Sequence, residues 1–157
     1  MIEPIDIEDR AVADRVVEIQ TAAYAVEADL MHFDGIPQLH ETSADVRSRT
    51  DLCWLGAYEE GELVGAIAWT EKPDAIDIDR LAVAPSHARR GHGRALVTAL
   101  PRASRLTVST GAANTPARGL YESLGYSLTA ETEIAPSVLV VHYEKQGEVP
   151  PMPGSSA

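Results

Sequence analysis

Two closely spaced segments constrain the fold of this chain more than any other feature of its sequence. The first runs from Leu81 to Leu96 and the second from Asn114 to Tyr126. In the first, an apolar run ends at Pro85, a basic turn follows, and a second aliphatic stretch begins at Ala95. Aliphatic runs separated by a glycine-containing turn are typical of strand, turn and helix in succession.

The turn Arg89-Arg90-Gly91-His92-Gly93 combines positive charge with two glycines. Gly91 and Gly93 can adopt backbone angles that other residues avoid, and they let the chain approach a ligand closely. The first amides of the following helix have no intrahelical partner, so with the helix dipole they favour an anion such as pyrophosphate. Arg94 adds a further positive charge. Taken alone, such a turn is equally typical of an ordinary helix start.

The second segment predicts a helix with one buried face. Asn114 or Thr115 can cap it, Pro116 suits its first position, and Gly125 can end it in the left-handed conformation. Its apolar side chains recur at helical spacing, namely Ala117, Leu120, Tyr121 and Leu124. On this pattern alone Tyr121 is an ordinary core aromatic with a hydrogen-bonded hydroxyl.

With the strand Leu106 to Thr110 between them, the two segments resemble the GNAT superfamily, the N-acetyltransferases that use acetyl-CoA. The resemblance covers residues 76–100 and 105–126, and more loosely residues 1–145. The second segment matches the family pattern Asn-x-x-Ala-x-x-Leu-Tyr-x-x-x-Gly-aromatic at every specified position. The first departs from the family, because Ala88 stands where glutamine or arginine is usual; main-chain amides and the neighbouring arginines still favour pyrophosphate binding.

The resemblance implies an α+β fold in α/β/α layers, with a mixed, mostly antiparallel central sheet and helices on both faces. The strand Asp77 to Val83 and the strand Leu106 to Thr110 would splay apart, and the pantetheine arm of CoA would enter the gap. Main-chain groups of Leu81 and Val83 would pair with the arm as another strand would. The expected cofactor contacts are Leu81, Ala82, Val83, Arg89, Arg90, Gly91, His92, Gly93, Arg94, Asn114 and Tyr121.

The chemistry implied is direct attack of an amine on the thioester in a ternary complex. The Val83 amide would hold the carbonyl oxygen, and the Tyr121 hydroxyl would protonate the leaving thiolate. Asp77 ranks first as the base, and Asp79 follows on the same strand face. Either aspartate could equally face solvent or pair with Arg80 or another arginine, so the base is left open.

The acceptor side is assigned to the irregular stretch after the first helix, because loops on a rigid scaffold commonly carry specificity. Its predicted substrate-binding residues are Phe33, Asp34, His40 and Glu41. His40 and His142 also fall in regions that line the acceptor side in the resembled family. The expected acceptor is a primary amine of a small molecule or peptide. A catalytically silent CoA-binding module for sensing or assembly is the alternative.

Other features narrow the class of protein. The net charge of -11 and pI near 4.8 argue against nucleic acid as a partner, since phosphate neutralisation needs a basic surface. Neither the five histidines nor the single Cys53 forms a metal-binding or disulfide pattern. No stretch approaches the roughly 20 apolar residues of a membrane span, and the acidic start lacks a signal-peptide pattern. We therefore expect a cytoplasmic protein without metal or membrane contact; a homodimer is left open.

The remaining chain predicts one domain, residues 1–145, with a disordered tail at 146–157 that is rich in proline, glycine and serine. A first amphipathic helix is expected from Asp9 to about Tyr24, and a capping box at residues 42–45 opens a short helix. The further strands expected are Cys53 to Tyr58 and Leu63 to Thr70, joined as a hairpin, and Tyr126 to Ala130 with Val138 to Glu144 as a final pair.

Overall fold

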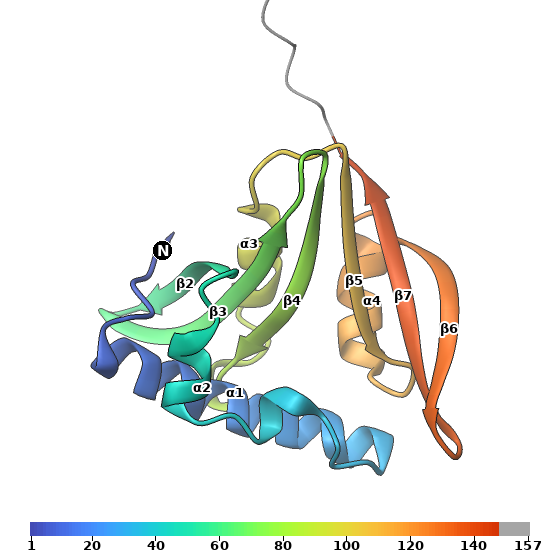
Figure 1. The fold of residues 1–157 in the computed structure, drawn as a ribbon, viewed down its shortest axis with the longest axis horizontal. Coiled ribbons are helices and arrows are strands. Elements are labelled where there is room, and N and C mark those ends of the chain that lie inside the picture. Colours follow the sequence, from blue (N-terminus) through green and yellow to red (C-terminus); the bar gives the residue numbers. More distant parts are fainter. Residues whose placement is uncertain (148–157) are drawn as a thin grey trace, which may run out of the picture.

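A seven-stranded sheet in the order β1-β2-β3-β4-β5-β7-β6 forms the centre of the molecule (Figure 1). The structure, a computed structural model, describes residues 1–147. The strands are β1 (Ile2–Pro4), β2 (Cys53–Glu59), β3 (Glu62–Glu71), β4 (Ala75–Val83), β5 (Arg105–Gly111), β6 (Ser127–Ala135) and β7 (Val138–Gln146). The α-helices are α1 (Arg10–Met31), α2 (Ser43–Ser48), α3 (His92–Thr98) and α4 (Thr115–Ser123).

Of the strand pairs in this sheet, β4 and β5 are parallel and the others antiparallel. This confirms the predicted mixed, mostly antiparallel α+β sheet. β4 and β5 pair from Ala75 and Arg105 to Ile78 and Val108, and beyond these residues the two strands diverge. The divergence leaves the gap visible between β4 and β5 in Figure 1.

Helices cover the two faces of the sheet with separate apolar cores. On one face, Leu96 of α3 and Tyr121 of α4 pack with Ile76 and Ile78 of β4. On the other, Val16 and Ile19 of α1 pack with a row of alanines on β3, on β4 and directly after β4, namely Ala66, Ala68, Ala82 and Ala84. Small residues on that side let a long helix lie close to the sheet.

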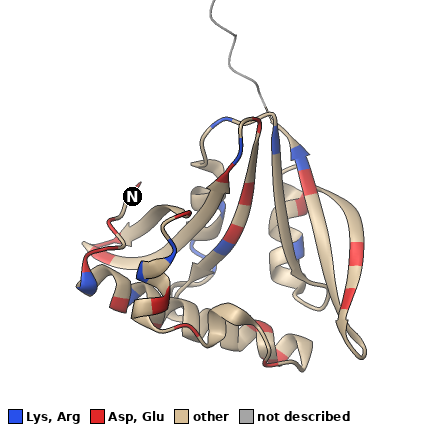
Figure 2. Cartoon of the chain, in the orientation of Figure 1, with Lys and Arg blue, Asp and Glu red and all other residues tan. Residues whose placement is uncertain are grey.

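A β-bulge in β4 changes which face its side chains reach. Trp69 pairs with Ile78 and Ala68 pairs with Arg80, so Asp79 has no partner residue on β3. The acidic side chains of β4, Asp77 and Asp79, point to the face that α1 covers. After the bulge, Arg80 and Ala82 point to that same face. Asp79 and Arg80 are therefore neighbours on one side of the sheet, although strict alternation would separate them. β4 is accordingly a strand with acidic and basic side chains close together (Figure 2).

Several boundaries differ from the sequence expectation. α1 continues to Met31, because Ala28 and Met31 pack on Ile36 and Val138 across the fold. β1 was not expected; its three residues lie alongside β2. β6 runs to Ala135 although its residues up to Ile134 are exposed, since pairing with β7 satisfies its main chain whatever its side chains are.

Other predicted local features are confirmed. Thr42 and Asp45 form the capping box that opens α2. Asn114 caps α4 and Gly125 follows it with a φ of 92°. β7 extends through Gln146, one residue past the predicted domain boundary. Residues 148–157 of the predicted tail lie outside the described residues. Within residues 1–147 no helix is both long and apolar enough to cross a membrane.

Candidate functional site

A groove of about 520 Å³, here the turn groove, runs from the basic turn to the start of α4. Eight of the predicted cofactor contacts line it: Leu81, Val83, Arg89, Gly91, His92, Gly93, Arg94 and Asn114. Ala82 and Arg90 do not line it. Ala82 is buried against the α1 face, and Arg90 turns away to an ion pair with Glu59, 2.7 Å between Nη1 and Oε2.

The turn is shaped by left-handed backbone. Gly91, the cap of α3, has a φ of 83°, and Arg89 has a φ of 63°. Glycine adopts this conformation without strain, and here it turns the chain from the end of β4 into the helix. A Cβ on Gly93 would lie 3.4 Å from the side chain of Leu120, at the wall of the groove. A longer side chain at this position would extend into the groove.

The arginines of the turn differ in the side-chain partners they already have. Glu59 accepts from Arg90 and lies 3.2 Å from His87, and the Arg90 guanidinium lowers the pKa of that carboxyl. Arg94 donates to the Ser123 hydroxyl at 2.7 Å. Among the described residues, Arg89 has neither an ion pair nor a side-chain hydrogen bond. Arg89 and Arg94 therefore both line the groove without a carboxylate partner in residues 1–147, and Arg89 has no side-chain hydrogen bond there either.

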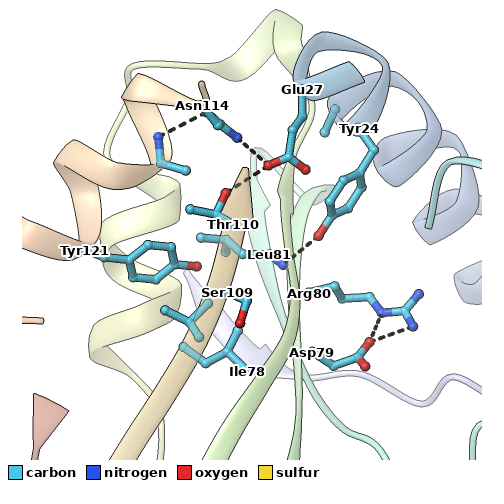
Figure 3. Close-up of a pocket in the computed structure, with 13 residues that line it drawn as sticks. Tyr24, Glu27, Ile78, Asp79, Arg80, Leu81, Ser109, Thr110, Asn114 and Tyr121 are labelled. Carbon is cyan, nitrogen blue, oxygen red and sulfur yellow. Dashed lines mark hydrogen bonds and ion pairs between the residues drawn. The ribbon is translucent and has the colours of Figure 1, made fainter. Parts of the chain in front are cut away.

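A smaller cavity of about 90 Å³, here the junction cavity, lies where β4 and β5 diverge. Tyr121 of α4 reaches it, and Figure 3 shows its hydroxyl pointing toward the gap. The ring packs edge-on against Tyr126, with 5.3 Å between centroids. Within the described chain the Tyr121 hydroxyl has no hydrogen-bond partner, unlike that of an ordinary core tyrosine. Burial, and then the nearby Tyr24, raise the pKa of Tyr121 well above 10, so it stays protonated.

The open edge of β4 presents main-chain groups to this cavity. The Tyr24 hydroxyl accepts from the Leu81 amide at 3.3 Å, and on the other edge the Ala84 amide donates to Val64 of β3. Because main-chain groups of alternate residues face the same edge of a strand, the N–H and C=O groups of both Leu81 and Val83 face the gap. Leu81 lines the junction cavity, whereas Val83 lines only the turn groove. Leu81 therefore shares the junction cavity with Tyr121, whereas the role of the Val83 amide as carbonyl donor stays a prediction.

Glu27 of α1 was not anticipated from the sequence. It connects α1 to the end of β5 and the start of α4 on the far side of the gap. It is 9% exposed, and its Oε1 accepts from the Thr110 hydroxyl and the Asn114 amide, each at 2.8 Å. Asn114 Oδ1 also accepts from the Ala117 amide, so both ends of the Asn114 side chain have partners. Glu27 lies 83 residues from Thr110 in sequence, and no local pattern could have revealed this contact.

A third cavity of about 320 Å³, here the loop cavity, opens on the α1 face beside the gap. Phe33 lines one side, Ile134 and Val140 line another, and Asp77 and Ser109 contribute polar groups. Asp34 and His40 belong to the same loop but are outside the lining; the His40 ring bonds the Asp34 carbonyl. Whether these two bind a substrate stays a prediction.

Glu41 lies in an ion-pair cluster beneath the loop. It pairs with the buried side chain of Arg80. The Arg80 guanidinium also lies 5.4 Å from the centroid of the Trp54 ring and pairs with Asp79 at 2.8 Å. Asp79 lies 3.5 Å from a second guanidinium, that of Arg49. The structure therefore gives Glu41 a buried arginine partner, while its role in substrate binding stays a prediction. It gives Asp79 the arginine pairing that the sequence left open.

Asp77, ranked first as the base, lines the loop cavity but not the junction cavity. Its Oδ1 accepts from the Thr107 hydroxyl at 2.6 Å; the Asp77 side chain is exposed and that of Thr107 is half-buried. In residues 1–147 no three histidine, cysteine, aspartate or glutamate side chains gather as metal ligands would.

Known proteins provide an independent comparison. The model of the acetyltransferase (GNAT) family matches residues 14–126. UPF0157 protein YqkA of Bacillus subtilis (strain 168) is 31% identical over 144 residues, which cover 89% of this chain and 42% of that protein. The chain thus spans less than half the length of this relative.

Two solved structures share the fold at low sequence identity. The ribosomal-protein-S18-alanine N-acetyltransferase of Escherichia coli is 18% identical with a TM-score of 0.75, covering 100% of this chain and 97% of that one. The PaiA N-acetyltransferase of Thermoplasma acidophilum, solved in complex with coenzyme A, is 16% identical with a TM-score of 0.70, covering 93% and 98%.

Proposed function

Since the chain belongs to the acetyltransferase (GNAT) family, we propose that it transfers an acetyl group from acetyl-CoA to a primary amine of a small molecule or peptide. Tyr121 carries this proposal. Its hydroxyl is protonated, has no partner in the described chain, and shares a small cavity with Leu81, whose amide donates only to the Tyr24 hydroxyl. A proton donor and an oxyanion donor on one cavity are what thioester cleavage requires.

The turn groove would hold the CoA moiety of the co-substrate. Main-chain amides of the turn and the free guanidinium of Arg89 would contact the diphosphate. Leu81 and Val83 would pair with the pantetheine amides along the open edge of β4. The thioester would then reach the junction cavity, where its oxygen would replace the Tyr24 hydroxyl as acceptor of the Leu81 amide hydrogen.

The amine would enter through the loop cavity and attack the thioester carbonyl carbon. A nitrogen–carbon bond forms, the carbon–sulfur bond breaks, and the amine gives up one proton to a nearby base or to solvent. Leu81 would hold the oxyanion, and Tyr121 would donate its proton to the departing sulfur. Because burial raises the pKa of Tyr121, it regains a proton readily after each turnover.

Acetyl-CoA and a panel of amines, covering polyamines, amino acids, aminosugars and peptide N-termini, test this proposal. We expect thiol release that depends on the amine, and a product heavier by one acetyl group. Thermal melting with CoA is measured in parallel. Stabilisation by CoA without amine-dependent thiol release from any member of the panel would instead favour the silent CoA-binding module.

A further inference from the structure

A row of three polar side chains crosses the sheet beside the junction cavity. Ser109 of β5 and His142 of β7 are directly opposed in the strand register, and 2.6 Å separates Ser109 Oγ from His142 Nδ1. On the other side of the ring, His142 Nε2 lies 2.8 Å from Thr132 Oγ1 of β6. Both ring nitrogens therefore have hydroxyl partners, which fix the plane of the imidazole.

Ser109 stands at the boundary of two cavities. It lines the junction cavity, which Tyr121 and Leu81 also line, and it lines the loop cavity, through which an acceptor would enter. His142 lines neither cavity and lies behind Ser109 on the partly exposed face of β7. The serine hydroxyl thus connects the meeting point of the two substrates to an imidazole at the surface.

The carboxylates near the same point are less suited to accept a proton. Two guanidiniums, those of Arg49 and Arg80, balance the charge of Asp79. Glu27 also lines both cavities, but its Oε1 already accepts three hydrogen bonds, from Thr110, Gly111 and Asn114. Asp77 is outside the junction cavity.

We propose that Ser109 and His142 form a proton relay that deprotonates the acceptor amine during acetyl transfer. The amine nitrogen passes a proton to Ser109 Oγ while the Ser109 hydroxyl hydrogen moves to His142 Nδ1. The resulting imidazolium donates its Nε2 hydrogen toward Thr132 and returns one proton to solvent. The relay requires a neutral ring with its hydrogen on Nε2, and it rests on the acetyltransferase function proposed above.

Few charged side chains in residues 1–147 lie around the His142 ring. Glu144 lies on the same strand and face as the ring. Asp77 of β4, bonded through Thr107, and Asp79, paired with Arg80, lie on this side of the sheet as well. From β6, Thr132 faces the ring, whereas Glu131 acts on Arg118 at the opposite face. Glu27 of α1 contacts Thr110, the residue after Ser109.

Steady-state kinetics across pH 5.5 to 9.5, with the best amine of the panel, test the relay. We expect His142→Gln and Ser109→Ala each to lower kcat by about 10²-fold, the usual scale for a positioned proton acceptor. The double variant should fall no further than either single one, because both residues serve one transfer. The acidic limb of the pH profile should disappear in His142→Gln, while the KM for acetyl-CoA and the CoA-induced melting shift stay unchanged.

Two threonines provide a matched pair. Thr132→Val removes the hydroxyl bonded to the ring and should lower kcat about threefold. Thr129→Val removes a hydroxyl of the same strand that bonds only the His142 carbonyl, and it should leave kcat unchanged. Nitrogen-15 NMR of the imidazole gives a readout that does not depend on turnover, and the relay predicts the Nε2–H tautomer in the parent.

The outcomes separate the two proposals. A parent without turnover for any amine would overturn the acetyltransferase function and the relay with it. An active parent whose Ser109→Ala and His142→Gln variants keep kcat within threefold, or an Nδ1–H tautomer, would overturn the relay alone. Multiplicative losses in the double variant would also reject it, because independent effects multiply.

Discussion

The two sides of the gap between β4 and β5 are built in different ways. The turn groove takes its walls mainly from two continuous segments, the end of β4 with its basic turn and the start of α4. The loop cavity gathers side chains from α1, the loop after it, β4, β5, β6 and β7. The first side is specified largely by local sequence, although α1 also contributes Ala23, Val26, Glu27 and Leu30, and the second side depends on long-range contacts.

This difference suggests that the two sides have separate functions, one in cofactor binding and the other in amine binding. A groove made mostly from short continuous motifs depends less on the rest of the chain for binding its co-substrate. A cavity whose side chains come from distant segments can change its ligand through single substitutions on any of them. We therefore expect variants on the two sides to separate cofactor binding from amine binding, and the following predictions test that separation.

The largest effect is expected for Gly93→Asp in the turn groove. A carboxylate there would extend toward the diphosphate, and like charges placed together cost several kcal/mol. The CoA-induced rise in melting temperature should vanish. Gly119→Asp is the control, because Gly119 is exposed on α4 with open space around its Cβ. A normal shift in Gly93→Asp would reject the turn as the diphosphate site.

Tyr121→Phe should lower kcat by about 10²-fold with little change in either KM, since the proton is needed in the transition state. The CoA-induced melting shift should remain, because the ring is retained. Tyr126→Phe, in the same aromatic cluster, removes a hydroxyl outside the junction cavity and serves as the control. Turnover within threefold of the parent would reduce Tyr121 to a core aromatic.

The pH profile of the parent gives a related check. Tyr121 can donate only below its pKa, and burial raises that pKa, so the active form persists to higher pH. We therefore expect no loss of kcat up to pH 9.5 from ionisation of Tyr121. A basic limb below pH 9 that disappears in Tyr121→Phe would contradict the raised pKa.

The same contrast explains what could be predicted from the sequence. The turn, the cap at Asn114 and the helical spacing of Tyr121 are local patterns, and they located most of the turn groove. The bulge at Asp79 and Arg80 depends on pairing with β3, and no pattern within β4 marks it. Tyr24 and Glu27 function through partners 57 and 83 residues away, so their roles emerge only when the chain folds.

Glu41→Ala should affect stability more than substrate binding. The substitution would leave buried Arg80 with one carboxylate partner, and such losses cost about 2 kcal/mol in the free energy of unfolding. Urea denaturation measures this cost. Glu62→Ala, which removes an exposed partner of Arg15, should cost at most about 1 kcal/mol. A stable Glu41→Ala variant with a raised KM for the amine would restore Glu41 to the substrate site.

The smallest effect is expected at Phe33, the aromatic wall of the loop cavity. Phe33→Ala should raise the KM for the amine about tenfold, since about 1.4 kcal/mol of apolar contact corresponds to that factor. The KM for acetyl-CoA should not change. Asp34→Ala alters an exposed neighbour outside the cavity lining and is the control. An equal rise in Asp34→Ala would mean that the carboxylate, and not the ring, recognises the amine.

Gly35→Ala examines the same ring without removing it. A Cβ on Gly35 would lie 2.3 Å from Phe33 Cζ, so the added methyl must displace the ring from its place over the glycine. If the position of the ring shapes the loop cavity, Gly35→Ala should raise the KM for the amine as Phe33→Ala does. If Phe33 contributes only apolar area, the displaced ring should still bind the amine and the KM should stay near that of the parent. Phe33→Ala and Gly35→Ala together therefore distinguish a cavity wall that depends on the position of the ring from one that depends only on apolar area. This test concerns the loop cavity, which local sequence patterns predict least well.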